Sequence, residues 1–188
     1  MAKKALSKKG KYELSFEPIV AINENASKPH ALPTAKILNR GDLLLVDAGL
    51  KYKRYCSDRT RTVNLKSKFS FKTEQKFKNK MMQKAYDTVL KAHDKAIEMA
   101  RSGMRADEID KIGRDIITKA GFGKYFVHST GHGVGLDIHE MPYISSNSKT
   151  TIEDGMVFTI EPGIYIPNKF GIRIEDMVAM VEGRAIIL

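Results

Sequence analysis

The chain has 188 residues, of which 42% are hydrophobic and 29% are charged, proportions typical of a globular domain with a sizeable core. Its single cysteine, Cys56, excludes an internal disulfide, and no apolar run is long enough for a membrane helix, so we expect a cytoplasmic protein without membrane contact. The net charge is +10, but the lysines are dispersed and accompany no zinc-finger or aromatic-basic motif, so nucleic acid is not an expected partner.

The first part of the chain is predicted to be mostly strand. Residues 13–22 form a strand that starts near Phe16, and a loop follows over 23–34, where two prolines break any period. The apolar run at 42–50 is bounded by glycines and predicts a buried strand. Strand character then continues to about Leu65.

Two amphipathic helices are predicted next, and each ends at a glycine. In residues 70–103 apolar side chains recur at three- and four-residue steps, and residues 105–121 show a similar pattern. Three further strands are expected at 156–166, 171–181 and 185–188. Strands, then helices, then strands indicate an α+β fold with a largely antiparallel sheet.

Asp47 and Asp58 are the first residues that suggest chemistry. In an unbulged hairpin whose turn is centred after Tyr52, the two aspartates face each other across the ladder. Like charges directly opposite destabilise a sheet, so a positive group should lie between them. Arg59 or Arg61 could supply it, but strand alternation points both side chains away from the Asp58 face. A metal ion is therefore the better candidate.

Two glutamates and a histidine-rich loop extend this pattern. Glu161 ends an otherwise apolar strand, and Glu175 alternates with isoleucines in "GIRIEDM"; a solvated strand face is the alternative for both. The segment "HSTGHGVGLDIHE" contains three histidines and three glycines. Glycine permits close backbone approach, so a loop wrapped around a site is expected there. For each histidine, an ordinary core or surface position is the alternative.

Charge and ligand chemistry narrow the kind of metal. Four carboxylates carry a charge of −4, which two divalent ions would neutralise, whereas the metal-free arrangement would be strongly repulsive. Oxygen-dominated ligation with one imidazole and no thiolate suits manganese, cobalt, iron or zinc, and argues against a structural zinc site. Since the chain as a whole is basic, the acidic site is expected to be local.

Four segments now support a family resemblance. "VDAG…CSDRTRT", "GHGVGLDIHEMP", "GMVFTIEPGIY" and "IRIEDMV" resemble the signature blocks of the dinuclear-metal pita-bread peptidases, which include methionine aminopeptidase, aminopeptidase P and prolidase. The match runs from about Ser15 to Leu188, and "SFEPIVAINENASKPHALP" and "YCSDRTRTV" resemble the Xaa-Pro branch. The resemblance implies a curved antiparallel sheet with helices on its outer face. The first helices would be missing here, so residues 1–188 would be a metallopeptidase catalytic domain incomplete at its N-terminus.

The resemblance also implies site roles, carried over motif by motif. It implies five metal ligands, namely Asp47, Asp58, His132, Glu161 and Glu175. Asp58 and Glu175 would bridge two divalent ions, with manganese favoured and cobalt, zinc or iron as alternatives. It implies four substrate-binding residues, namely His30, His128, His139 and Arg173. Glu161 would relay a proton to the leaving nitrogen, and His128 and His139 would stabilise the oxyanion as catalytic residues.

The implied activity is metal-dependent hydrolysis of the peptide bond between an N-terminal residue and a following proline. The enzyme would be an aminopeptidase or a dipeptidase, and a homodimer in its full-length form. One alternative is a methionine aminopeptidase, against which "KPHALP" and "SDRTRT" argue. Another is a non-catalytic pita-bread module that binds protein or RNA, against which the complete set of ligand positions argues.

Overall fold

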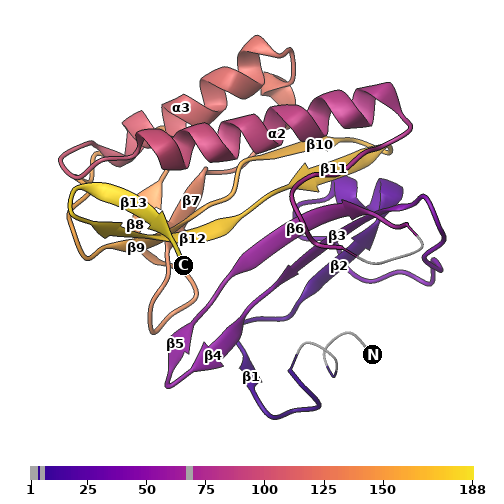
Figure 1. Cartoon of the computed structure of the whole chain (residues 1–188), viewed down its shortest axis with the longest axis horizontal. Helices are drawn as coiled ribbons and strands as arrows, with labels where there is room; N and C mark the ends of the chain where they lie inside the picture. The colour runs from indigo at the N-terminus through magenta and orange to yellow at the C-terminus, as the bar shows by residue number, and fades with distance from the viewer. Residues whose placement is uncertain (1–3, 5–6, 67–69) are drawn as a thin grey trace.

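The computed structural model describes residues 4, 7–66 and 70–188 (Figure 1). Within these described residues the strands form four sheets, and all of their pairings are antiparallel. Two long helices lie side by side along one face of the strands (Figure 1). The α+β class expected from the sequence is therefore correct. Among the described residues, no helix combines the length and the apolar character that a membrane crossing requires.

Between residues 7 and 66, the first half of the molecule is built from strands and a 3-10 helix. Its elements are β1 (Glu13–Leu14), β2 (Ile19–Ile22), η1 (Asn23–Ser27), β3 (Leu43–Ala48), β4 (Leu50–Tyr52), β5 (Tyr55–Cys56) and β6 (Arg59–Asn64). β2, β3 and β6 form one sheet in that order, and β1, β4 and β5 form another. The strand predicted at 13–22 is thus two short strands, and Pro18, which has no amide hydrogen to donate, lies in the gap.

The second half contains the two long helices and the remaining strands of the described residues. Its elements are α2 (Lys80–Met99), α3 (Ala106–Lys119), η2 (Gly123–Tyr125), β7 (Gly131–Gly133), β8 (Glu140–Ile144), β9 (Val157–Ile160), β10 (Gly163–Ile166), β11 (Phe170–Arg173), β12 (Asp176–Val181) and β13 (Arg184–Ile187). β10 and β11 form a separate hairpin, whereas the other five strands form a sheet in the order β13-β12-β9-β7-β8. The strands predicted at 156–166 and 171–181 are each interrupted at a glutamate.

The first helix is shorter than predicted. It begins at Lys80, because the Asn79 side chain accepts hydrogen bonds from two backbone amides of the first turn and so caps the helix. The preceding residues are irregular, and Gln75 there accepts a hydrogen bond from the amide of Asn64 at the end of β6. At the other end, the helix stops at Met99, and the predicted terminator Gly103 lies in the turn that follows.

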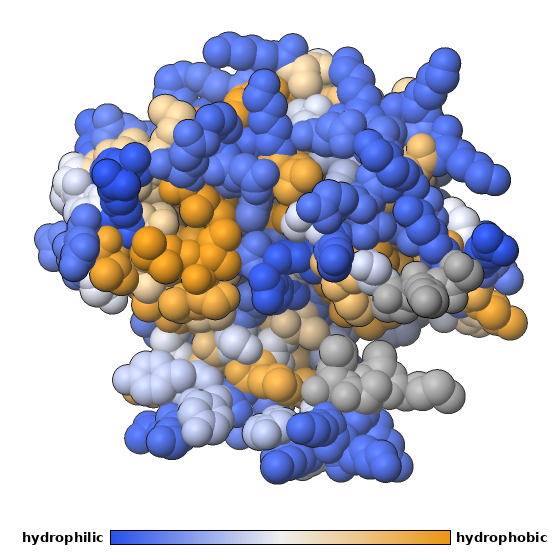
Figure 2. Space-filling model, viewed as in Figure 1, coloured by the Kyte–Doolittle hydropathy of each residue, from blue (hydrophilic) through white to orange (hydrophobic). Residues whose placement is uncertain are grey.

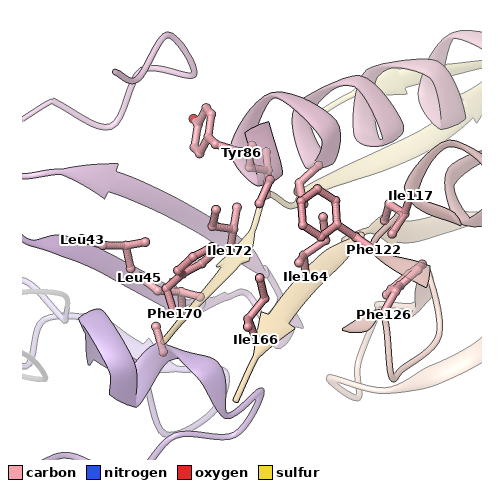
Figure 3. Packing of buried hydrophobic residues seen from close by; sticks show 14 of the residues in the cluster. Leu43, Leu45, Tyr86, Ile117, Phe122, Phe126, Ile164, Ile166, Phe170 and Ile172 are labelled. Atoms are coloured by element: carbon pink, nitrogen blue, oxygen red, sulfur yellow. The ribbon is translucent and has the colours of Figure 1, made fainter. Parts of the chain in front are cut away.

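The β10–β11 hairpin lies at the centre of the molecule and is buried on both faces. Ile164, Ile166, Phe170 and Ile172 alternate toward the larger hydrophobic core, which also includes side chains from α2, α3 and β3 (Figure 3). Burying each such side chain stabilises the fold by about 1.5–3 kcal/mol. The other face of the hairpin carries Arg173 and lines a polar pocket. This hairpin therefore connects the core directly to the candidate site.

Candidate metal centre and substrate pocket

One pocket of about 310 Å³ brings together every site residue predicted from the sequence. The nine residues come from both halves of the chain: His30, Asp47, Asp58, His128, His132, His139, Glu161, Arg173 and Glu175. The structure thus places them in one location, although it does not by itself test their roles. Phe16, Ile19, Ile138 and Tyr143 add apolar surface to the same pocket.

The two aspartates come from the first half, but they are not directly opposite each other as predicted. Asp47 on β3 pairs with Thr60 on β6. The turn is formed by Lys53 and Arg54, which both have positive φ, and it is centred one residue later than the prediction assumed. A shift of the partner by two residues preserves the face of the strand, so Asp47 and Asp58 still line the same pocket.

The predicted exclusion of the two β6 arginines is correct. Arg59 and Arg61 are on the opposite face of the sheet, where both form ion pairs with Asp176 at distances of 2.6 and 2.8 Å. Neither residue lines the pocket. Cys56 is buried, and its Sγ lies 3.6 Å from the carbonyl oxygen of Leu136.

The second half supplies the histidines and glutamates from strand ends and loops. His132 is in the middle of β7, and its glycine neighbours allow a close strand approach: a Cβ at Gly131 would overlap the carbonyl oxygen of Thr159. Glu161 directly follows β9, and Glu175 lies between β11 and β12. As predicted, the isoleucines around Glu175 face the core while Glu175 faces the pocket.

His132 directs an unprotonated ring nitrogen toward the carboxylates. Its Nδ1 lies 3.0 Å from the carbonyl oxygen of Gly133, which makes Nδ1 the hydrogen donor. Its Nε2 lies 3.3 Å from Glu161 Oε1 and 3.7 Å from Asp58 Oδ2. Burial lowers the pKa of His132 to about 4, so at neutral pH Nε2 carries a lone pair rather than a proton. A lone pair that faces carboxylate oxygens is the arrangement of a metal ligand.

The carboxylates themselves are crowded and short of positive partners. Asp58, His132 and Glu175 each place one ligand atom within 4.8 Å of the others. Burial, reinforced by neighbouring carboxylates, raises the pKa of Asp58 to about 9 and that of Glu175 well above its usual range. Among the described residues, Oδ1 of Asp47 and Oδ1 of Asp58 are buried carboxylate oxygens without a hydrogen-bond donor. The donor set therefore fits hard divalent cations.

Arg173 is the one arginine that lines this pocket among the described residues. Its Nη2 lies 2.5 Å from Asp47 Oδ2, and its Nε donates to the Thr60 hydroxyl at 3.0 Å. Its Nη1 donates to the Tyr165 hydroxyl at 2.7 Å, and that hydroxyl lies 2.9 Å from His128 Nε2. A single guanidinium thus connects a predicted metal ligand to a predicted substrate-binding histidine.

The three other predicted histidines occupy different parts of the pocket. His128 is held at both nitrogens, by Tyr165 and by the Ser129 carbonyl oxygen, and burial followed by the charge of Arg173 lowers its pKa to about 4. His139 is exposed, and its ring meets the ring of His132 edge-on, with centroids 4.3 Å apart. His30 is exposed at the rim, after η1.

A comparison with known families supports the interpretation of these motifs. The model of metallopeptidase family M24 matches residues 1–182. The chain belongs to this family. A family of metallopeptidases implies bound metal ions, and the pocket offers a group of ligands, Asp58, His132 and Glu175, that could hold one.

Relatives within family M24 match almost the whole of this chain. An Xaa-Pro dipeptidase of Pyrococcus furiosus is 44% identical over 171 residues, which are 91% of this chain and 46% of the relative. A putative Xaa-Pro aminopeptidase of Mycoplasma genitalium is 45% identical over 184 residues, which are 97% of this chain and 49% of the relative. The chain spans about half the length of the curated relatives it matches.

A solved M24 structure confirms the fold. The prolidase from Pyrococcus furiosus matches with a TM-score of 0.84 and 44% identity, over 93% of this chain and 49% of that chain. The pita-bread architecture expected from the sequence motifs is thus correct.

Tyr165 and Thr60 were not predicted from the sequence. Tyr165 connects Arg173 to His128, and the Thr60 hydroxyl donates to Glu175 Oε2 at 2.5 Å and accepts from Arg173. Strand alternation could have found Tyr165, since it lies between two core isoleucines and opposite Gly171, two residues from Arg173. Thr60 could have been predicted only with the correct hairpin register, which pairs it with Asp47.

Proposed function

We propose that this chain hydrolyses the peptide bond between an N-terminal residue and a following proline, as the metallopeptidase catalytic domain formed by residues 1–188. The observation that supports this most strongly is the convergence, in one pocket, of four carboxylates and a neutral imidazole nitrogen. The names of the M24 relatives, Xaa-Pro dipeptidase and prolidase, support the choice of substrate. We also propose a homodimer for the full-length form.

The metal ligands in this proposal are Asp47, Asp58, His132, Glu161 and Glu175. Asp58 and Glu175 would serve both of two divalent ions, and the oxygen-rich donor set favours manganese. When bound, such ions polarise a substrate carbonyl and make a water molecule acidic enough to attack it at neutral pH. The remaining chemistry belongs to the protein's own side chains.

Glu161 is suited to moving the proton. Burial raises its pKa to about 7, so near neutral pH its carboxyl group can both accept a proton and return it. It borders the pocket beside His132, and its backbone amide is anchored to the carbonyl oxygen of Thr130 at 2.7 Å. In the proposed reaction Glu161 takes the proton of the attacking water and delivers it to the proline nitrogen as the bond breaks.

His128 and His139 are proposed to stabilise the negative charge that develops on the carbonyl oxygen. In the structure His128 Nδ1 donates to the Ser129 carbonyl oxygen, and the Tyr165 hydroxyl, 2.9 Å away, donates to Nε2. In the proposed reaction the developing oxyanion takes over one of these two hydrogens. Arg173 would contribute its positive charge to substrate binding, because it donates to that same hydroxyl. His30, at the rim, would contact the end of the peptide.

The apolar wall of the pocket suits a proline side chain. Phe16, Ile19 and Ile138 form a surface against which a pyrrolidine ring can pack. Proline also has no amide hydrogen and restricts the residue before it, so an enzyme that recognises an extended backbone by hydrogen bonds handles it poorly. Recognition of ring shape is therefore the expected basis of selectivity.

The test is an assay of the metal-depleted protein reloaded with manganese, cobalt or zinc. We expect release of the first residue from Xaa-Pro peptides and little release from a Met-Ala peptide. Asp58→Asn should abolish activity, whereas Asp154→Asn, outside the pocket, should not. Failure of the folded, metal-loaded protein to cleave Xaa-Pro peptides would contradict the proposal.

The same assay distinguishes the alternatives. Preference for Met-Ala would identify a methionine aminopeptidase. Salt-sensitive RNA binding by a protein that retains no metal would identify a binding module.

A further inference from the structure

Helix α3 contributes no side chain to the described lining of the pocket, yet it holds the loop that does. Asp110, on α3, is 1% exposed and forms a two-point ion pair with Arg114 one turn later. The Arg114 Nε and Nη2 atoms lie 2.7 and 2.8 Å from the two carboxylate oxygens of Asp110. Such forked pairs fix direction as well as distance.

Each partner of this pair also binds the backbone of the histidine-rich loop. Asp110 Oδ1 accepts hydrogen bonds from the amide and the hydroxyl of Thr130, at 3.2 and 2.8 Å. Arg114 donates to the carbonyl oxygens of His128 and Phe126, at 2.9 and 3.3 Å. The guanidinium also stacks on the Phe126 ring, 4.2 Å from its centroid.

These contacts lead directly to three site residues. His128 is itself bound through its carbonyl oxygen, and its ring packs edge-on against Phe126. Thr130 precedes the β7 segment that carries His132. The Thr130 carbonyl oxygen accepts a hydrogen bond from the amide of Glu161 at 2.7 Å, so Thr130 connects Asp110 to the residue that follows β9.

We propose that Asp110 and Arg114 are positioning residues that fix His128, His132 and Glu161 in their catalytic arrangement. This inference rests on the proposed peptidase function. A buried ion pair adds little net stability compared with apolar side chains, because desolvation offsets the attraction. Its hydrogen bonds, by contrast, determine where the loop backbone lies, and supporting partners of metal ligands commonly control both affinity and rate.

Two conservative changes test the inference in the full chain. Arg114→Lys keeps the positive charge but loses the fork, and Thr130→Val removes the hydroxyl with almost no change in shape. Thr130→Ser keeps the hydroxyl, so this variant should show the hydrogen exchange and the activity of the wild-type protein. Asp115→Asn is the matched control, because the Lys111–Asp115 pair has the same spacing on the exposed face of α3.

The first readout is hydrogen exchange of the metal-free protein, which does not depend on activity. We expect exchange at the amides of Thr130 and Glu161 to accelerate about tenfold or more in Arg114→Lys and Thr130→Val, since local opening sets these rates. Exchange in β3 and β6 should stay unchanged. Unchanged exchange at Thr130 and Glu161 would overturn the proposal.

The second readout is the hydrolysis of an Xaa-Pro peptide with manganese. The two variants should lower kcat about 10- to 100-fold, with KM changing less than about threefold. A lower melting temperature with unchanged kcat would show that the pair is merely structural and would overturn the positioning role. If the wild-type protein cleaves nothing, the proposed function fails, and accelerated exchange together with about 10- to 100-fold weaker manganese binding would still support the positioning.

Discussion

The two halves of the molecule place their predicted metal ligands in different ways. In the first half, Asp47 lies on a regular antiparallel ladder, and the strand register alone determines the face it occupies. In the second half, His132 and Glu161 lie on a three-residue strand and just after a strand end, and helix α3 anchors the loop residue Thr130, which precedes His132 and bonds to Glu161. A ladder thus positions a side chain through its own hydrogen bonds, whereas a loop requires an external support.

The helical layer and the candidate site also differ in the charged side chains that they carry. Hydrophilic side chains project along the upper edge in Figure 2, where the two helices lie in Figure 1. Helix α2 alone carries four lysines. The four carboxylates of the candidate site, in contrast, are gathered in the pocket, where Arg173 forms an ion pair with Asp47. The basic overall charge and the acidic site therefore coexist because they occupy different layers of the molecule.

The largest expected effect comes from removing one ligand from either half. Asp58→Asn in the first half and Glu175→Gln in the second should each weaken manganese binding by more than the roughly 100-fold that loss of a supporting partner costs. Titration calorimetry measures this. Equal losses would show that both halves share the metals, whereas full binding by Asp58→Asn would show that the second half holds the metal by itself.

A smaller effect is expected from filling the close approach at Gly131. Gly131→Ala should lower the free energy of unfolding by about 1–3 kcal/mol or more, because the new methyl group would overlap the Thr159 carbonyl oxygen. Gly113→Ala on α3 is the control, since its nearest neighbour would be 3.8 Å away, and it should stabilise the protein by about 0.5–1 kcal/mol. Urea unfolding measures both, and equal effects would contradict the close packing of β7.

Metal binding should also release protons at neutral pH. In the metal-free protein the pKa of Asp58 is about 9 and that of Glu175 is well above its usual range, so both carboxyl groups hold protons at pH 7. A metal ligates the deprotonated forms, so binding should expel about one proton or more and should tighten as the pH rises toward 9. Calorimetry in two buffers with different ionisation enthalpies measures the release, and identical heats would contradict it.

The smallest effect is expected at the exposed start of α3. Arg105 and Lys149 hydrogen-bond to Asp107 and lower its pKa to about 2. A carboxyl group whose pKa falls on folding stabilises the protein above its ordinary pKa of 3.8, and this stabilisation is lost as the pH falls toward 2. Asp107→Asn should therefore be slightly less stable than wild type at pH 7 and indistinguishable below pH 2. A constant difference across thermal melts at these pH values would argue against the ion pairs.

Much of the site could be predicted because strand alternation and motif order are local properties. Alternation correctly placed Glu175 toward the pocket and Arg59 and Arg61 away from it. The predicted pairing of Asp47 directly opposite Asp58 was wrong. The register depends on which turn residues adopt positive φ, and the residue types at Lys53 and Arg54 do not indicate that these two do so.

What could not be predicted depends on contacts between distant segments. The capping of α2 at Asn79 competes with an apolar pattern that starts earlier, and the segment before it is held by Gln75 against β6. The links through Tyr165 and Asp110 join elements that are far apart in the chain. No local pattern reports such contacts.

Thr60 gives the molecule one further property. Its carbonyl oxygen accepts the amide of Glu175, its hydroxyl donates to the carboxylate of the same residue, and that hydroxyl also accepts from Arg173. Moving the two halves apart would therefore break three hydrogen bonds at the candidate metal centre. In the proposed peptidase, a peptide would therefore enter through the existing opening of the pocket, and the size of that opening would limit the length of peptide accepted.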